Sequence, residues 1–300
     1  MRLVVAGGTG FIGSALCRRL LECGHSVTLL TRSGPSAVRQ ANAKPLTWNP
    51  SEPGAWEAAI NGSDGIINLA GEPIAKRWTE RQKQKIASSR VQSTRTLVEA
   101  IGRAKEKPKW LLNASAIGYY GSHGSEPLSE EAGPGSDFLS RVCVAWEREA
   151  EKAESHGLRV VRLRTGIVLG KGGGALAKMV PPFKLFMGGP LGSAEQWISW
   201  IHLDDEIALI LFLMEHPDAQ GAINATAPNP VTMSQFCKTI GEVLNRPSWA
   251  PVPAFALRLM LGEMADMLLT GQRVLPAAAQ KLGYSFKYPT LLEALRSLDL

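Results

Sequence analysis

A glycine-rich segment near the N-terminus, Gly7-Gly8-Thr9-Gly10-Phe11-Ile12-Gly13, has the spacing of a phosphate-binding turn. Gly7 permits a tight turn, Gly10 lets the backbone approach a pyrophosphate, and Gly13 lets a helix pack closely on a strand. Amides at the start of such a helix point toward the bound anion. The alternative is a glycine turn that binds no ligand. Because the pattern predicts a strand before the turn and a helix after it, the phosphate site is favoured.

The end of the next expected strand, Thr31-Arg32-Ser33, bears on which dinucleotide would bind. A site that prefers NAD carries Asp or Glu there, which accepts hydrogen bonds from the ribose 2′-hydroxyl. Arg32 instead offers a planar, permanently charged group that suits a 2′-phosphate, and Ser33 adds a hydroxyl donor. The alternative is that Arg32 simply faces solvent. We therefore predict NADP(H) as the cofactor.

The elements that must position these residues alternate between short apolar runs and longer helical patterns. Continuous apolar strands are typical of a parallel sheet that helices cover on both faces. The expected strands are 3–6, 26–31, 65–69, 110–114 and 159–163, and the expected helices between them are 11–22, 55–60, 79–104 and 138–155. The fold class is therefore α/β, with a Rossmann-type doubly wound parallel sheet.

The second half of the chain changes character near residue 166, where glycine and proline become frequent. We expect loops and short elements around a pocket there. Helices resume at about 204–214, 233–244, 255–269 and 290–298. We predict an NADP-binding domain over 1–165 and a smaller mixed α/β substrate-side region over 166–300, with a helical tail from about 248. Elements of the two regions can interleave.

Several motifs along the chain resemble a known family. Asn68-Leu69-Ala70-Gly71, Ser115, Arg162-Leu163-Arg164, Trp200 to Asp205 and Asn224 resemble the extended short-chain dehydrogenase/reductases, which include the nucleotide-sugar epimerases. Asn68 to Ile74, Arg77-Trp78-Thr79, Ser115 to Gly121 and the tail from Pro251 are similar to its atypical "epimerase family" branch, which is NAD-dependent epimerase/dehydratase-like. Relatives in cyanobacteria and plastids have been linked to division control.

The resemblance implies a cofactor site beside the glycine turn, with Asn68 to Gly71 next to the adenine ribose. For Asn68 itself, a stabilising turn is an equally good interpretation. The residues expected to bind the cofactor are Gly7, Thr9, Gly10, Phe11, Ile12, Gly13, Thr31, Arg32, Ser33, Asn68, Leu69, Ala70, Gly71, Arg90 and Ser115.

The acid/base pair that most of this superfamily uses is absent from the sequence. That pair is a Tyr followed four residues later by a Lys, whose charge lowers the pKa of the phenol. The stretch from Phe138 to Glu147 of the expected helix over 138–155 contains neither residue type. The four tyrosines are followed at that spacing by other residues: Tyr119 by His123, Tyr120 by Gly124, Tyr284 by Tyr288 and Tyr288 by Leu292.

Three interpretations of the missing pair stay open. The first is an oxidoreductase or epimerase in which Ser115 works with Tyr119 or Tyr120, although aromatic packing is an alternative role for both tyrosines. The second is a catalytically weak NADP-binding sensor or regulatory protein, for example in cell or plastid division control. The third is a structural interaction protein with an unused glycine turn.

Residues beyond 160 could contact a small-molecule substrate. Arg164 and Lys171 could hold an anionic group, and Gln196 and Trp197 could line the same cleft, with solvated surface charges as the alternative. His202, Asp204 and Asp205 introduce an expected helix, where acidic residues cap amides, so we expect a structural role. A lone His without a third ligand makes no zinc site, and we predict no metal.

Composition narrows the function classes further. The 300 residues carry a formal net charge of +6, but the basic residues form no block, so we expect no nucleic-acid partner. No apolar run is long enough to span a bilayer, and a strand is expected from the first residues, which leaves no signal peptide. We expect the cytosol or an organelle stroma, a monomer or homodimer, and hydride transfer at a hydroxyl or carbonyl carbon of an unknown, nucleotide-sugar-like substrate.

Overall fold

A seven-stranded parallel sheet forms the centre of the computed structural model, which describes residues 1–32 and 43–300. The strand order is β3-β2-β1-β4-β5-β7-β11, and the order of the strands reverses between β1 and β4, which pair directly. A reversal of this kind opens a crevice at the carboxyl ends of the strands. The strands are β1 (Arg2–Ala6), β2 (Ser26–Thr31), β3 (Lys44–Thr47), β4 (Gly65–Asn68), β5 (Trp110–Ala116), β7 (Arg159–Thr165) and β11 (Gly221–Ala225).

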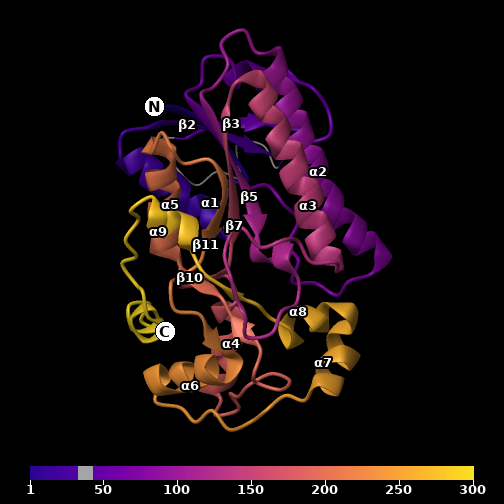
Figure 1. Ribbon diagram of the computed structural model, residues 1–300, viewed down its shortest axis with the longest axis vertical. Coiled ribbons are helices and arrows are strands. Elements are labelled where there is room, and N and C mark those ends of the chain that lie inside the picture. Colours follow the sequence, from indigo (N-terminus) through magenta and orange to yellow (C-terminus); the bar gives the residue numbers. More distant parts are fainter. Residues whose placement is uncertain (33–42) are drawn as a thin grey trace.

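Helices cover both faces of this sheet, which explains why its strands are apolar without alternation (Figure 1). One face carries α2 (Glu80–Arg103) and α3 (Phe138–Glu151), and the other carries α1 (Phe11–Glu22), α5 (Leu203–Glu215) and α9 (Ala277–Lys281). Each face has its own buried apolar cluster. The predicted Rossmann-type α/β fold is confirmed.

Local sequence signals set where these helices begin. Thr79 caps α2 by accepting a hydrogen bond from the Gln82 amide, and Asp137 caps α3 through the Ser140 amide. At α5 the cap is the His202 ring, which accepts from the Asp204 amide at 3.0 Å. We expected an acidic cap there. Asp205 instead lies buried and accepts from backbone amides of the C-terminal segment.

The lower part of the molecule in Figure 1 is built from short elements around a third buried cluster. Its helices are α4 (Leu176–Lys184), α6 (Met233–Leu244), α7 (Ala254–Leu261), α8 (Asp266–Leu269) and α10 (Leu291–Arg296). Three strand pairs connect them: β8 (Ile167–Leu169) with β10 (Trp200–His202), β9 (Trp197–Ile198) with β12 (Val231–Thr232), and β6 (Pro127–Leu128) with β13 (Arg273–Val274). Four 3₁₀ turns complete the described chain: η2 (Ala55–Ala59), η3 (Ile117–Tyr120), η4 (Lys152–His156) and η5 (Gly262–Ala265).

The structure differs from the expected elements at several places, of which the following bear on the fold. The strands β3 and β11 were not expected, and β11 joins the central sheet although it follows residue 166. The helix α4, nine residues long, lies in a stretch expected to form loops and short elements, with Pro181 and Pro182 inside it. In place of the single helix expected over 255–269, the chain forms α7, η5 and α8 in succession. The first break is at Gly262, whose φ is +62°. Glycine adopts that angle without strain, and it therefore ends α7.

Candidate functional site

The glycine turn between β1 and α1 is a cradle that only glycine can form. Gly7 has a φ of +79°, and a Cβ added to it would lie 2.5 Å from the Leu69 carbonyl. A Cβ on Gly13 would lie 2.3 Å from the carbonyl oxygen of Gly7. The helix α1 begins after Gly10, and no side chain caps it, in contrast to α2 and α3. Its first amides are therefore available to an anion.

The other predicted residues of this turn take different positions. Thr9 is exposed, whereas Ile12 packs against the apolar cluster under α1. The Phe11 ring contacts the glycine-rich segment after β8, since a Cβ on Gly173 would lie 2.2 Å from that ring. Phe11 therefore joins the turn to the lower part of the molecule.

Arg32 follows the end of β2 at the same edge of the sheet as the cradle, because Ala6 pairs with Leu30. Thr31 is buried at the last position of the strand, and the exposed Arg32 follows it. The pKa of Glu72 lies below its ordinary value, chiefly because Lys76 donates a hydrogen bond to it, and the charge of Arg32 contributes. Arg32 and Glu72, from separate loops, therefore lie near one another at this edge. Ser33 lies outside the described residues.

The Asn68 side chain is an internal brace rather than an exposed ligand. It is fully buried, and its Nδ2 donates to Asn113 Oδ1 at 2.7 Å and to Thr94 Oγ1 at 2.9 Å. Its Oδ1 accepts from the Ala70 amide. These bonds hold the turn that presents the Leu69 carbonyl to Gly7.

Arg90 supports the same turn from α2. Its guanidinium packs on Gly71, where a Cβ would lie 3.1 Å away, and lies over the Trp146 ring at 5.3 Å. It donates to the carbonyl oxygens of Glu72 and Ile86. Burial lowers the pKa of Arg90. Its hydrogen bonds go to the backbone, so in this structure it shapes the turn.

A buried polar network lies below the carboxyl end of β5. Ser115 donates to Glu147 Oε1 at 2.6 Å, and Arg164 binds both oxygens of the same carboxylate at 2.9 Å. All three side chains are nearly inaccessible. Two parallel charge-assisted hydrogen bonds fix the geometry of such a pair. Arg164, expected to face a substrate, is thus engaged inside the protein.

The two candidate tyrosines differ in their surroundings. Tyr120 is buried, donates to Asn224 Oδ1 at 2.7 Å and accepts from Arg164 Nη1 at 3.0 Å. Burial raises the pKa of Tyr120. Tyr119 is partly exposed, and the Arg164 guanidinium lies 3.4 Å from its ring centre. Tyr119 is therefore the more accessible of the two.

A second group of predicted residues lies beyond this network. Gln196 is buried and donates to the carbonyl oxygens of Leu191 and Leu268. Trp197 is partly exposed, and the Arg273 guanidinium lies over its ring at 4.7 Å. Gln272, next to Arg273, donates to the carbonyl of Ile117 at 2.9 Å, which links this group to the tyrosine turn.

A family model for the NAD-dependent epimerase/dehydratase family matches residues 3–225, and a domain of unknown function matches 252–298. The chain belongs to the NAD-dependent epimerase/dehydratase family. The chloroplastic epimerase family protein SDR39U1 homologue of Arabidopsis thaliana is 44% identical, over 99% of this chain and 86% of the relative. Epimerase family protein YfhF of Bacillus subtilis is 42% identical, over 99% of this chain and 98% of the relative.

Solved structures also resemble this epimerase/dehydratase family member. Human epimerase family protein SDR39U1, crystallised with NADPH, superposes with a TM-score of 0.88 at 33% identity, over 100% of this chain and 99% of the human one. The predicted family is confirmed, and the predicted cofactor, NADP(H), agrees with the nucleotide in the human protein. Among described residues, no helix is long and apolar enough to cross a membrane.

Sequence reasoning missed three polar side chains of this epimerase/dehydratase fold. Glu147 connects Ser115 to Arg164, but in the sequence it begins the largely charged run from Glu147 to Lys152 and so is not distinguished from its neighbours. Glu130 accepts from the Asn224 and Ala278 amides, and burial raises its pKa. Arg273 forms no ion pair within the described ranges, and its Nε lacks a hydrogen-bond partner there. Its proximity to Trp197 follows only from the fold.

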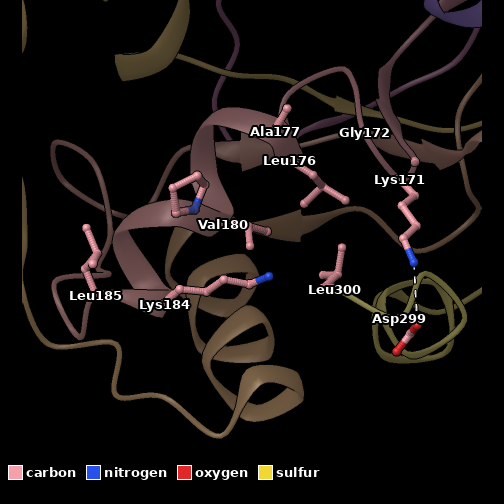
Figure 2. Close-up of a pocket in the computed structure, with 11 residues that line it drawn as sticks. Lys171, Gly172, Leu176, Ala177, Val180, Lys184, Leu185, Asp299 and Leu300 are labelled. Carbon is pink, nitrogen blue, oxygen red and sulfur yellow. Dashed lines mark hydrogen bonds and ion pairs between the residues drawn. The ribbon is translucent and has the colours of Figure 1, made fainter.

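A cavity of about 480 Å³ lies beside α4 (Figure 2). Leu176, Val180 and Leu300 form apolar walls, and Lys171 approaches Asp299 to 3.5 Å at the rim. Lys171 is exposed there. In the described part of the chain, no three His, Cys, Asp or Glu side chains come together as metal ligands.

Proposed function

We propose that this protein binds NADP(H) in the cradle formed by Gly7, Gly10 and Gly13. The observation that carries the proposal is the uncapped N-terminus of α1 behind a turn that a Cβ would fill. Backbone amides there suit a pyrophosphate, and Arg32 suits a 2′-phosphate. The NADPH of the human relative supports the assignment.

The proposed activity is that of an oxidoreductase or epimerase on a substrate with a hydroxyl or carbonyl carbon. The cofactor supplies the hydride, while the protein positions the substrate and handles the proton. Epimerisation uses the same hydride step transiently, so one site geometry suits both reactions. The name of the family supports this range of activities.

Ser115 is the proposed contact with the reacting oxygen. Because its proton is donated to Glu147, the Ser115 oxygen would act as an acceptor for a substrate hydroxyl. Tyr119 is the second candidate, since it is accessible. Tyr120 has both hydroxyl functions occupied, which supports a positioning role for it.

The proposed substrate carries an anionic group, as a nucleotide sugar does. Arg273 lies over Trp197 and forms no ion pair with a carboxylate among the described residues, so its charge is available to a ligand. A guanidinium held over an aromatic ring is well placed to bind phosphate in two hydrogen bonds. Gln196 donates to the neighbouring loops, and its place beside Trp197 keeps it within the proposed substrate site.

The compartment, assembly and domain division are further parts of the proposal. We propose the cytosol or an organelle stroma, in line with the chloroplastic relative, and a monomer or homodimer. We also propose the division at 165/166, with β11 crossing it to complete the sheet.

Calorimetric titration with NADPH, NADP⁺, NADH and NAD⁺ tests the cofactor proposal. We expect NADP(H) to bind most tightly, and Arg32→Asp to weaken NADP(H) by about a hundredfold while changing NAD(H) little. Arg18→Asp, the same charge change at an exposed position of α1, is the control and should leave affinity unchanged. Failure of all four nucleotides to bind would overturn the proposal.

A catalytically weak sensor is the alternative function, favoured by the enclosed Tyr120 hydroxyl and the missing Tyr–Lys pair. A screen of carbonyl substrates with NADPH separates the two functions. An enzyme oxidises NADPH with some substrate, and Ser115→Ala lowers kcat by at least about a hundredfold. If the protein is a sensor, no substrate is turned over, and the wild type and the Ser115→Ala variant bind NADPH with the same affinity.

A further inference from the structure

The exposed apolar side chains of this protein are concentrated at one end. Among the residues that the structure describes, every large apolar side chain that is more than half exposed lies in 185–187 or 249–260. They are Leu185, Phe186, Met187, Trp249, Phe255, Leu259 and Met260. Such concentration marks an interaction surface, whereas single exposed apolar residues scattered over a protein do not.

The backbone holds Phe186 outward at a strained position. It follows α4 with a φ of +61°, where glycine is favoured and a bulky side chain is an outlier. The Phe186 amide donates to the Phe183 carbonyl, and the Met187 amide donates to the Pro182 carbonyl. These two hydrogen bonds form a Schellman motif, in which the residue at the position of Phe186 is usually glycine. A glycine would satisfy this turn better and expose less apolar surface. The backbone of this turn therefore does not require an aromatic side chain, and 54% of the Phe186 surface remains exposed.

Phe186 and Trp249 form one surface, which we call the aromatic face. The Trp249 indole donates to the Phe186 carbonyl at 3.0 Å, and its amide donates to the Gly188 carbonyl at the same distance. Trp249 is 67% exposed despite these bonds. Leu185 and Met187 precede and follow Phe186 in the chain and are also exposed. The face is thus built by hydrogen bonds that present the rings to the outside.

Cations and hydrogen-bond donors border the aromatic face. The Arg246 guanidinium lies 4.5 Å from the centre of the Phe186 ring. Arg246 and Lys238 also line a hollow of about 640 Å³ with Ser234, Asn245 and Ser248. Within the described residues neither cation pairs with a carboxylate, whereas Glu242 in the same hollow pairs with Arg296 at 3.3 Å. The hollow therefore has a positive charge excess.

The neighbouring helix α7 has an exposed apolar side of its own. Phe255 and Leu259 are four residues apart and so lie on one side of this helix. Figure 1 shows α4, α6 and α7 together at the lower end of the molecule, away from the upper ends of α2 and α3. The aromatic face and α7 thus share one end of the protein.

We propose that the aromatic face rests on an anionic phospholipid bilayer. Leu185, Phe186, Met187 and Trp249 enter the interfacial region, where aromatic side chains are favoured. Arg246 and Lys238 receive lipid phosphate groups, which supply the charge complement that the hollow lacks. The combination of aromatic rings with unpaired cations at their edge favours a lipid surface over an apolar protein partner. The proposal does not depend on the cofactor or the reaction.

Sedimentation of the full-length protein with vesicles tests this. We expect binding to phosphatidylcholine vesicles containing about 30% phosphatidylglycerol, little binding to pure phosphatidylcholine, and weakening by salt. Phe186→Gly should lower the partition coefficient about tenfold. Because glycine suits this backbone position, the melting temperature of the Phe186→Gly variant should equal or exceed that of the wild type. Misfolding could then not explain its weaker binding to vesicles.

Charge variants separate the aromatic face from general attraction by the net charge. Arg246→Gln and Lys238→Gln should each lower partition about fivefold. Lys85→Gln removes the same charge from an exposed position of α2 and should have little effect. Equal losses in all three variants, or wild-type binding by Phe186→Gly, would overturn the proposal. The proposal would also be overturned if the protein did not bind vesicles but associated with itself, and if Phe186→Gly abolished that self-association. A second copy of the chain would then cover this face.

Discussion

Glu147 is the side chain on which the buried network depends, since Ser115 and Arg164 both bond to it. Glu147→Gln would leave the Arg164 guanidinium buried without a countercharge. We expect a loss of about 3–5 kcal/mol in the free energy of unfolding, measured by urea denaturation. If the free energy of unfolding fell by less than about 1 kcal/mol, as for an exposed ion pair, water would have to reach Arg164.

The exposed pair of Arg103 and Glu57, which also forms two hydrogen bonds, is the matched control. Glu57→Gln makes the same chemical change where solvent screens the charges, so we expect a loss of less than about 1 kcal/mol. Comparison of the two variants isolates the effect of burial.

Glu206 makes stability depend on pH. Burial raises the pKa of this carboxyl to about 8, while Thr165 donates to one of its oxygens. In the unfolded chain its pKa is about 4.3. Between these values the folded protein holds a proton that the unfolded chain has released, so stability falls as pH rises toward 8.

Glu206→Gln should remove this dependence while keeping an acceptor for Thr165. We expect the variant and the wild type to be similarly stable near pH 5 and the variant to be more stable near pH 8, by an amount on the order of a few kcal/mol. Urea denaturation at both pH values measures the difference. A constant difference between the proteins would refute the assignment.

At the scale of elements, the turn before α1 offers a direct comparison of two glycines. Gly7 and Gly24 have φ values of +79° and +78°, but backbone atoms lie 2.5 Å from a Cβ at Gly7, whereas nothing lies within 4 Å at Gly24. We expect Gly24→Ala to cost about 1–2 kcal/mol and to bind NADPH normally. Gly7→Ala should be destabilised as well, and its affinity for NADPH, measured by calorimetry, should fall by at least about a hundredfold. Retained binding in Gly7→Ala would place the nucleotide elsewhere.

Elements with strong local signals were predictable from the sequence. The bounds of α1 and α6 match the expected ranges, because a glycine turn and a Thr232 capping box mark their starts. The helix α4 was missed because Pro181 and Pro182 suppress the local pattern, although burial of Leu176 and Phe183 stabilises it. The strand β11 was missed because its pairing with β7 is a long-range contact.

The candidate site was predictable only where backbone geometry determines it. The glycine turn and Arg32 depend on local spacing, so the sequence alone was enough to propose both. The side-chain partners of Asn68, Ser115 and Tyr120 come from other strands and helices, and their direction depends on packing that no local pattern contains. A carboxylate such as Glu147 could not be assigned a partner before the sheet brought β5 and β7 together.

At the scale of the whole molecule, the two proposed regions are joined by buried contacts. The strand β11 completes the sheet, and Asn224 within it bonds to Tyr120, Glu130 and Leu275. We expect a single thermal transition with equal calorimetric and van't Hoff enthalpies. Two resolved transitions would show that the regions fold independently.

The place of β11 at the edge of the sheet also affects synthesis on the ribosome. The chain emerges from its N-terminus, so β7 is complete while the residues from 166 to 220 are still being added. During that interval the outer side of β7 has no strand partner, and an unpaired strand edge is prone to aggregation. The nascent chain thus passes through a vulnerable period that ends only when Gly221–Ala225 reaches the sheet, and any chaperone that assists its folding would act in that window.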